Sequence, residues 1–223
     1  MKLKLFKEAI LKFLLGVILV ALFLFVPAGS ISYFHGWLFM SILFIPMFIA
    51  GIIMLFKSPD LLKNRLMAKE NEKEQKILIK LSGLMFILEF IIAGLNYRFS
   101  WTNLPNIIII ISVLIFLISY ILYALVLREN VFLLRTINVL NDQKVIDTGF
   151  YKLARHPMYT ITIFLFLSMP LILNSIVSFL IFLIYPFIII KRLKNEEDFL
   201  EKNLDGYKEY MKKVKYRLIP FIW

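Results

Sequence analysis

Residues 159–190 read YTITIFLFLSMPLILNSIVSFLIFLIYPFIII, a run of 32 residues without a charged side chain. A membrane-spanning helix needs about 20 apolar residues, so this run is too long for one straight crossing. Asn174 and Ser175 interrupt it near the middle, and we predict a helical hairpin with arms at 159–173 and 176–190. At a rise of about 1.5 Å per residue, each arm reaches only about 22–24 Å, which is short for a full crossing.

Four further apolar runs precede the hairpin, and each is long enough to span a bilayer. Hydrophobic residues make up 61% of the 223 residues and charged residues only 18%, against about 25% charged in a soluble domain. A soluble domain of this size could not bury so much apolar surface. We therefore predict an all-α polytopic membrane protein with about six transmembrane helices, including the short C-terminal hairpin, and a cytoplasmic C-terminal helix. The four runs are 9–27, 34–56, 77–95 and 106–127.

The basic residues predict the orientation. The net charge is +11, and every Lys and Arg except Arg98 falls in one of four segments that this topology places on the same side. Because Lys and Arg collect on the cytoplasmic side, we expect both termini in the cytoplasm, and the membrane to be the plasma membrane of a prokaryote. We attribute the net positive charge to attraction between these segments and anionic lipid headgroups. No nucleic-acid-binding motif is present. The four segments are 2–12, 57–80, 128–155 and 191–217.

The chain has no cysteine and only two histidines, His35 and His156, so we expect no disulfide and no metal site. No internal repeat or low-complexity linker divides it. We predict one integral membrane domain over 1–223, in which 1–127 form a four-helix scaffold and 128–223 carry the chemistry. The bilayer and a lipophilic or lipid-anchored molecule are the expected partners, without nucleic acid.

Two features of the N-terminal half lead to structural predictions. Ser58, Pro59 and Asp60 are typical of a helix start, because they supply a cap, a first-turn proline and a first-turn acid. We predict an interfacial helix in the segment 57–76. Glu89 lies inside an apolar run, where an acid is either functional or hydrogen-bonded, and we expect a hydrogen bond within the bundle.

The polar sequence before the hairpin ends in Arg155, His156, Pro157, Met158 and Tyr159. Proline suits the first position of a helix, so the first arm is predicted to begin at Pro157 with His156 at its mouth. The N-terminus of a helix offers unpaired N–H groups to an anion, and Arg155 adds positive charge. A basic, aromatic anchor at the membrane interface has the same composition, and both interpretations stay open at this point.

The sequence after the hairpin places two acids on an apolar helix face. A helix continuing from residue 191 brings Glu197 into a leucine-rich stripe and Glu196 beside it. Arg192 precedes Glu196 by four residues, so the two can pair along the helix. Carboxylates in such a stripe are costly unless they are paired or used, which favours a functional role over solvated charge. The stripe consists of Leu193, Leu200, Leu204 and Met211.

These blocks together resemble a known family. TGFYKLARHPMY at 148–159, RLKNEEDFL at 192–200, GYKEY at 206–210 and YRLIP at 216–220 are similar to the isoprenylcysteine carboxyl methyltransferase family. That family belongs with the membrane phospholipid methyltransferases. The resemblance implies an S-adenosylmethionine-dependent methyltransferase that methylates the carboxyl oxygen of an isoprenylcysteine-like or other lipophilic acceptor.

The resemblance also implies roles for individual residues. Arg192 would face the acceptor carboxylate, Glu196 would contact the cofactor, and Glu197 is a second candidate for that acid. The side chains of the tyrosines and of His156, with the backbone of the 143–146 stretch, would hold S-adenosylmethionine. The cofactor-binding residues implied are Gln143, Lys144, Val145, Ile146, Tyr151, His156, Pro157, Met158, Tyr159 and Glu196.

The chemistry leaves two kinds of acceptor open. Methyl transfer from a sulfonium is an in-line displacement, so positioning of the reactants contributes most. A carboxylate acceptor needs only a cation such as Arg192 to orient it, whereas an amine must lose a proton, which a glutamate could take. Two other functions are a membrane NADPH-dependent reductase of the sterol-reductase type and a non-enzymatic small membrane transporter or structural protein.

Overall fold

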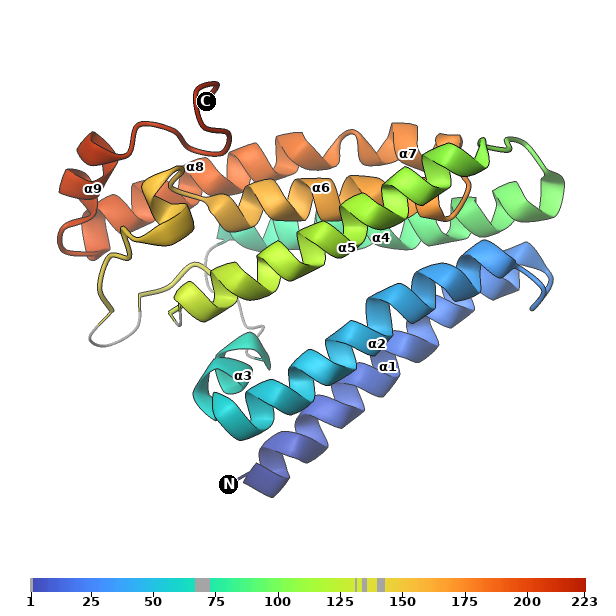
Figure 1. The fold of residues 1–223 in the computed structure, drawn as a ribbon, viewed down its shortest axis with the longest axis horizontal. Coiled ribbons are helices and arrows are strands. Elements are labelled where there is room, and N and C mark those ends of the chain that lie inside the picture. The colour runs from blue at the N-terminus through green and yellow to red at the C-terminus, as the bar shows by residue number, and fades with distance from the viewer. Residues whose placement is uncertain (1, 67–72, 131, 134–135, 140–142) are drawn as a thin grey trace.

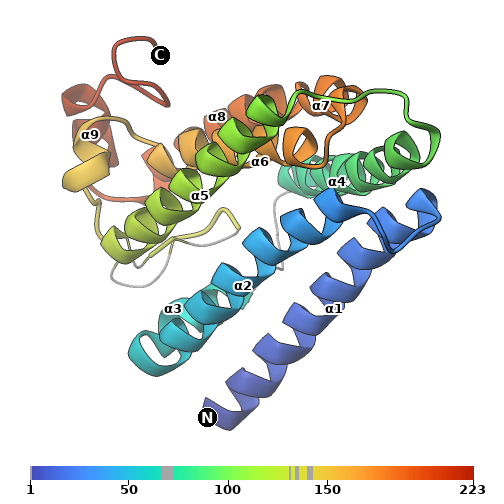
Figure 2. The same cartoon turned by 45° about the vertical axis from the view of Figure 1, so that its right-hand side comes forward.

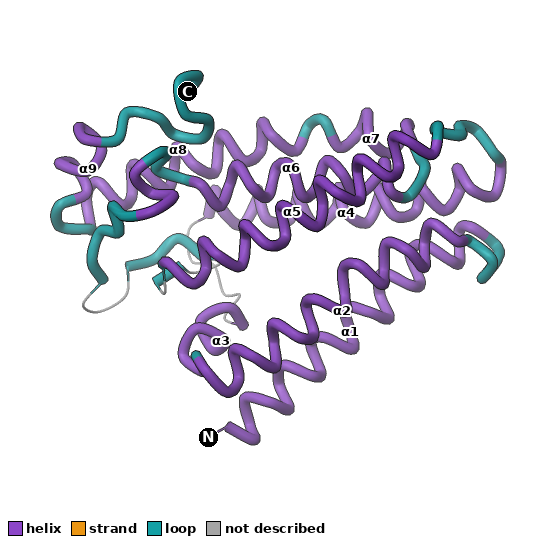
Figure 3. Tube along the Cα trace, in the orientation of Figure 1, coloured by secondary structure: helices purple, strands orange, loops and turns teal. Residues whose placement is uncertain are grey.

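The computed structural model describes residues 2–66, 73–130, 132–133, 136–139 and 143–223. Within those ranges all regular structure is helical and no strand occurs, as Figure 3 shows. The long helices lie along one another in an elongated bundle (Figure 1). The predicted all-α membrane architecture is therefore confirmed.

The predicted apolar runs form the long helices, which extend past the runs into the polar flanks. Helix propagation adds one hydrogen bond per residue once the apolar segment is helical, so the charged flanks join it. In the N-terminal half the helices are α1 (Lys2–Ala28), α2 (Phe34–Lys57), α3 (Pro59–Leu66), α4 (Lys73–Phe99) and α5 (Asn106–Glu129). In the C-terminal half they are the short 3₁₀ helix η1 (Gly149–Lys152), α6 (Pro157–Ile172), α7 (Ile176–Phe182), α8 (Tyr185–Asn203) and α9 (Tyr207–Lys213).

Five helical segments in the described ranges are long and apolar enough to cross a membrane. They are α1, α2, α4, α5 and the combined α7–α8 segment Ile176–Asn203. The sixth predicted span, α6, is a shorter apolar helix of 16 residues. Many leucine and isoleucine side chains on these helices face outward, which suits contact with lipid.

The hairpin turns where the sequence predicted, at Asn174, which has a positive φ of 59°. Its side-chain oxygen accepts a hydrogen bond from the Leu104 amide at 2.7 Å. In the second arm, a break at Leu183 and Ile184 separates α7 from α8. Pro186 explains this break, because proline clashes with the carbonyl of the residue four positions earlier, where α7 ends.

The predicted tail helix from residue 191 is the continuation of the membrane arm, because α8 runs through both without interruption. The predicted stripe was wrong beyond Leu200. Leu204 has an extended backbone and Gly206 a φ of 81°, so the helix ends at Asn203. Leu204 and Met211 nevertheless pack in the same apolar cluster as Leu200.

Both chain ends lie at the same end of the long axis, together with α3 and α9 (Figure 1). The turns that join α1 to α2 and α6 to α7 lie at the opposite end, as the rotated view in Figure 2 also shows. There the Tyr33 hydroxyl donates to the Leu173 carbonyl, and the Asn96 amide donates to the Asn174 carbonyl at 2.9 Å. Arg98, the basic residue outside the four basic segments, lies in the last turn of α4 at that end.

Two N-terminal predictions have different outcomes. The interfacial segment forms α3, which begins at Pro59 as predicted, and the charged stretch 67–72 lies outside the described residues. Glu89 is fully buried in α4, but neither of its carboxyl oxygens has a hydrogen-bond partner within the described ranges. The hydrogen bond expected for this side chain is therefore not found. Its backbone carbonyl accepts from the Ser178 hydroxyl at 3.2 Å.

Candidate active site

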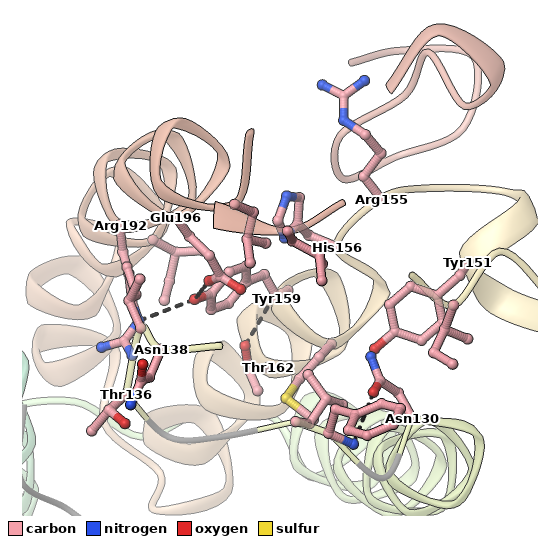
Figure 4. Close-up of a pocket in the computed structure, with 18 of the residues that line it drawn as sticks. Asn130, Thr136, Asn138, Tyr151, Arg155, His156, Tyr159, Thr162, Arg192 and Glu196 are labelled. Carbon is pink, nitrogen blue, oxygen red and sulfur yellow. Dashed lines mark hydrogen bonds between the residues drawn. The ribbon is translucent and has the colours of Figure 1, made fainter. Parts of the chain in front are cut away.

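A cavity of about 460 Å³ lies between α4, α6, α8, α9 and the segment that follows α5, within the size range of small-molecule sites. Figure 4 shows side chains from several of these elements converging on it. All predicted site residues line it except Pro157 and Glu197. The lining residues that the sequence predicted are Gln143, Lys144, Val145, Ile146, Tyr151, His156, Met158, Tyr159, Arg192 and Glu196.

Tyr159 connects the two motifs that the hairpin separates in sequence. Its hydroxyl donates a hydrogen bond to the Glu196 carboxylate and accepts one from Arg192 Nε at 3.0 Å (Figure 4). The predicted pair on α8 is thus joined through a hydroxyl from the first turn of α6. The His156 ring stacks on the Tyr159 ring, with 5.7 Å between centroids. One wall of the cavity therefore presents a cation, a carboxylate and a hydroxyl side by side.

His156 and Pro157 form the start of α6 as predicted, with His156 at the N-cap and Pro157 in the first turn. Pro157 is buried at the helix start and is not among the residues that line the cavity. Its fixed φ suits the helix start and so sets the direction in which α6 leaves the motif.

The two adjacent glutamates point to different environments. Glu196 lines the cavity, whereas Glu197 is only 3% exposed and lies in an ion cluster outside it. The Glu197 carboxylate accepts from Arg155 Nε at 2.6 Å and Arg217 Nε at 2.7 Å, and lies 3.2 Å from His156 Nε2. A buried carboxylate is tolerated when cations and hydrogen bonds surround it in this way.

The C-terminal tail is fastened along the motif that starts α6. The backbone amides of Arg155 and His156 each donate to a tail carbonyl, Tyr216 and Arg217 respectively, both at 2.9 Å. Arg155 Nη1 also donates to the Val214 carbonyl at 2.8 Å. The tail residues after α9 therefore hold Arg155 and His156 in place, although no tail residue in the described range lines the cavity.

Three buried tyrosines line the polar part of the cavity. The Tyr210 hydroxyl donates to the Tyr151 carbonyl at 2.8 Å, and the Tyr207 hydroxyl lies 3.4 Å from His156 Nε2. The buried Tyr151 hydroxyl points toward Asn130 (Figure 4). Burial raises the pKa of all three phenols above its ordinary value, so they stay neutral hydrogen-bonding groups at physiological pH.

The 143–147 stretch has no regular secondary structure, and its first four residues line the cavity. Among the described residues, the amides of Lys144, Val145 and Ile146 make no hydrogen bond within the chain. Asp147 accepts from Lys213 Nζ at 2.5 Å, which ties the stretch to α9. That hydrogen bond and the lysine charge lower the pKa of the Asp147 carboxyl.

The sequence analysis missed part of the lining. Tyr207 and Tyr210 were inside the GYKEY motif, and their spacing of three places both on one face of α9. The lining residues of α4 also recur at helical spacing. The middle of α4 is mostly apolar, so its sequence does not distinguish the face that lines the cavity from the face that contacts lipid. Other lining residues that the sequence did not identify include Arg65, Ile79, Ser82, Gly83, Phe86, Asn130, Thr136, Asn138, Thr162 and Ile189.

Residues 106–206 match the family model described as phospholipid methyltransferase. This segment is similar to the phospholipid methyltransferase family. The match confirms the superfamily that the sequence motifs predicted. It runs from the first residue of α5 to Gly206, and it includes every predicted site residue. No curated protein matches the chain.

The family match implies that the chain is a methyltransferase, and the five apolar helices place it in a membrane. The phospholipid methyltransferase segment supplies α5, α6 and α8, while Tyr207 and Tyr210 of the cavity lie beyond its end. In the described parts of the chain, no group of three or more His, Cys, Asp or Glu side chains could hold a metal ion.

Proposed function

We propose that the protein is an S-adenosylmethionine-dependent methyltransferase that esterifies the carboxylate of an isoprenylcysteine-like or other lipophilic acceptor. The observation that supports this most is the Tyr159 hydroxyl, which joins Arg192 and Glu196 on one wall of the cavity. A cation for the acceptor and a carboxylate for the cofactor then stand next to each other. Such an arrangement suits a reaction in which positioning lowers most of the barrier.

The polar part of the cavity fits S-adenosylmethionine. The unpaired backbone amides of Val145 and Ile146 can hydrogen-bond the edge of a purine, and the buried Tyr151 hydroxyl offers a further polar contact. Glu196 and the tyrosine rings can stabilise the positive charges of the cofactor. When bound, the cofactor supplies an electrophilic methyl group. The residues named here would bind and orient it.

The charges of the cavity favour an anionic acceptor. Arg65, Lys144, Arg155 and Arg192 are the cations in the described lining, and Glu196 is the acid. Arg155 pairs with Glu197, and the other charged residues of the described lining are three cations and one acid, so its remaining charge is positive. A carboxylate is already a nucleophile and needs no base. The Arg192 guanidinium can orient it through paired N–H donors.

The α4 wall supports a lipophilic acceptor. Ile79, Ser82, Gly83 and Phe86 recur at helical spacing on the cavity side of a membrane-spanning helix. The Ser82 hydroxyl is satisfied by the Leu78 carbonyl at 2.9 Å, so it does not require a polar ligand. A Cβ on Gly83 would meet no atom within 4 Å, which leaves room for an apolar chain. Burial of that chain would contribute roughly 25 cal/mol per Å² of apolar surface.

We further propose that the cavity faces the cytoplasm of a cell whose plasma membrane holds the protein. Both termini lie at the end of the bundle that holds α3 and α9 (Figure 1), and α9 contributes Tyr207 and Tyr210 to the cavity lining. Anionic headgroups on the cytoplasmic leaflet would then stabilise this orientation. The cofactor would enter from water and the acceptor from the bilayer.

The function is tested with purified, detergent-solubilised full-length protein. Calorimetry with S-adenosylhomocysteine should give a dissociation constant in the micromolar range. Labelled methyl transfer should then be measured into N-acetyl-S-farnesylcysteine and into phosphatidylethanolamine. Base-labile label that is released as methanol marks a carboxyl ester, whereas base-stable label marks an amine product.

Absence of binding by folded protein would overturn the proposal. Base-stable label in phosphatidylethanolamine alone would replace the carboxylate acceptor with an amine. A fluorescence titration with NADPH in place of S-adenosylhomocysteine tests the reductase alternative, which requires NADPH to bind.

A further inference from the structure

The last residue of α5 makes two hydrogen bonds to a turn far along the chain. Glu129 Oε1 accepts from the Thr148 hydroxyl at 2.9 Å, and Glu129 Oε2 accepts from the Phe150 amide at 3.1 Å. A carboxylate at the C-terminus of a helix faces the negative end of the helix dipole, so this position is unfavourable for α5 itself. The turn supplies the compensating donors.

Gly149 lies directly against this carboxylate. Its φ is 43°, in the left-handed region, and a Cβ at this position would lie 2.1 Å from Glu129 Oε1. A side chain there would push the Glu129 carboxylate away, and the positive φ would strain any residue other than glycine. The turn and the carboxylate thus touch at a point that only glycine allows.

The turn carries Tyr151 to the cavity. The Tyr151 amide donates to the Thr148 carbonyl at 2.8 Å, and the Tyr151 carbonyl accepts from the Tyr210 hydroxyl at 2.8 Å. The backbone of Tyr151 is therefore held on both sides, and its side chain lines the cavity. Glu129 is not among the lining residues, and its two hydrogen bonds to the turn connect it to Tyr151.

We propose that Glu129 is a positioning residue of the cofactor site: its carboxylate fixes the 148–150 turn and thereby sets the place of Tyr151 in the cavity wall. The proposal rests on the function proposed above. In this proposal, the last residue of α5 aligns one wall of the cofactor pocket.

A double-mutant cycle tests the proposal, with calorimetric affinity for S-adenosylhomocysteine as the readout. Glu129→Ala and Gly149→Ala should each weaken binding about tenfold, the effect of losing hydrogen bonds to a charged group. The double variant should bind more tightly than the two single losses combined predict, because Glu129→Ala removes the carboxylate with which the new Cβ clashes. The positive φ of Gly149 strains alanine in both backgrounds. Additive losses of about a hundredfold would overturn the proposal.

Two milder variants keep the proposal testable if Glu129→Ala or Gly149→Ala does not fold. Glu129→Gln keeps the shape of the side chain, and Thr148→Ala removes only one of the two hydrogen bonds. Both should raise the cofactor KM more than they lower kcat. Equal losses of kcat with unchanged KM and unchanged affinity would contradict a positioning role.

A measurement without cofactor separates this inference from the proposed function. Amide hydrogen exchange at Phe150 should be faster in Glu129→Gln than in the parent protein, because the amide loses its charged acceptor. If the parent protein binds no S-adenosylhomocysteine, the proposed function fails while this exchange result still tests the contact. If it binds and Glu129→Gln leaves both exchange and affinity unchanged, only the present inference fails.

Discussion

The guanidinium of Arg155 donates through Nε to the carboxylate of Glu197 at 2.6 Å, and both side chains are almost wholly buried. Arg155 belongs to the motif before the hairpin and Glu197 to the helix after it. Arg217 of the tail completes the cluster. If a buried charge pair loses one member, the remaining charge has no partner. The cluster therefore depends on a residue from each of three segments: the motif before the hairpin, the helix after it and the tail.

Glu197→Gln should destabilise the protein by about 3–5 kcal/mol, the range for breaking a buried ion pair. Thermal unfolding in detergent measures the change. The control is Glu201→Gln, on the same helix, because Glu201 has an exposed partner, Lys208, at 3.9 Å. That variant should lose about 1 kcal/mol or less. Equal melting temperatures for the two variants would refute the structural importance of the cluster.

Arg192→Ala should keep affinity for S-adenosylhomocysteine close to that of the parent protein while methyl transfer falls about a hundredfold or more. The physical reason is that the acceptor loses its orienting cation but the cofactor contacts stay. Lys194→Ala, on an exposed position of the same helix, is the matched control and should leave turnover unchanged. Full turnover by Arg192→Ala would remove the role proposed for this residue.

Gly83→Leu should discriminate against acceptors with a long apolar chain. The new side chain would occupy open space beside Ile79 and Phe86, so KM for a farnesylated acceptor should rise about tenfold or more while cofactor affinity stays constant. Gly51→Leu is the control, since a Cβ there also meets no atom within 4 Å but Gly51 does not line the cavity. The same KM in both variants would show that the α4 wall does not contact the acceptor.

The Asp147–Lys213 contact predicts a pH dependence of stability. The pKa of Asp147 is lowered in the folded protein by the hydrogen bond to Lys213, so this contact stabilises the fold above the unfolded pKa of about 3.9. The contribution disappears as the pH falls through the lowered pKa. The melting-temperature difference between parent and Asp147→Asn should therefore be constant above about pH 5 and shrink in more acidic buffer. A difference that grows on acidification would contradict the assignment.

The hairpin and the two motif blocks were predictable because each rests on a local rule. Proline at a helix start placed Pro157, and an uncharged run of 32 residues required a turn near Asn174. The helical spacing of the leucines predicted that Glu197 lies on the buried face of the helix. It could not show that the partners of Glu197 are Arg155 and Arg217. Those contacts depend on where the tail returns, which no local pattern specifies.

The remaining differences have the same origin. α8 ends at Asn203, before Leu204 and Met211 could join its stripe, yet the chain folds back and returns both to the same cluster. The sequence did not indicate which face of α4 lines the cavity, because Gly83 and Phe86 differ from their lipid-facing neighbours only in how they pack. The contact between Glu129 and the 148–150 turn spans about twenty residues of sequence, and its two ends carry no charge pattern that would pair them.

The order of synthesis gives the ion cluster one further consequence. Arg217 and the tail carbonyls that hold Arg155 are translated after α1 to α8. These helices can therefore insert and pair before the tail contacts have formed. Chains that stop before residue 214 would be expected to reach the bilayer yet lack the contacts that hold Arg155 and Glu197 in place.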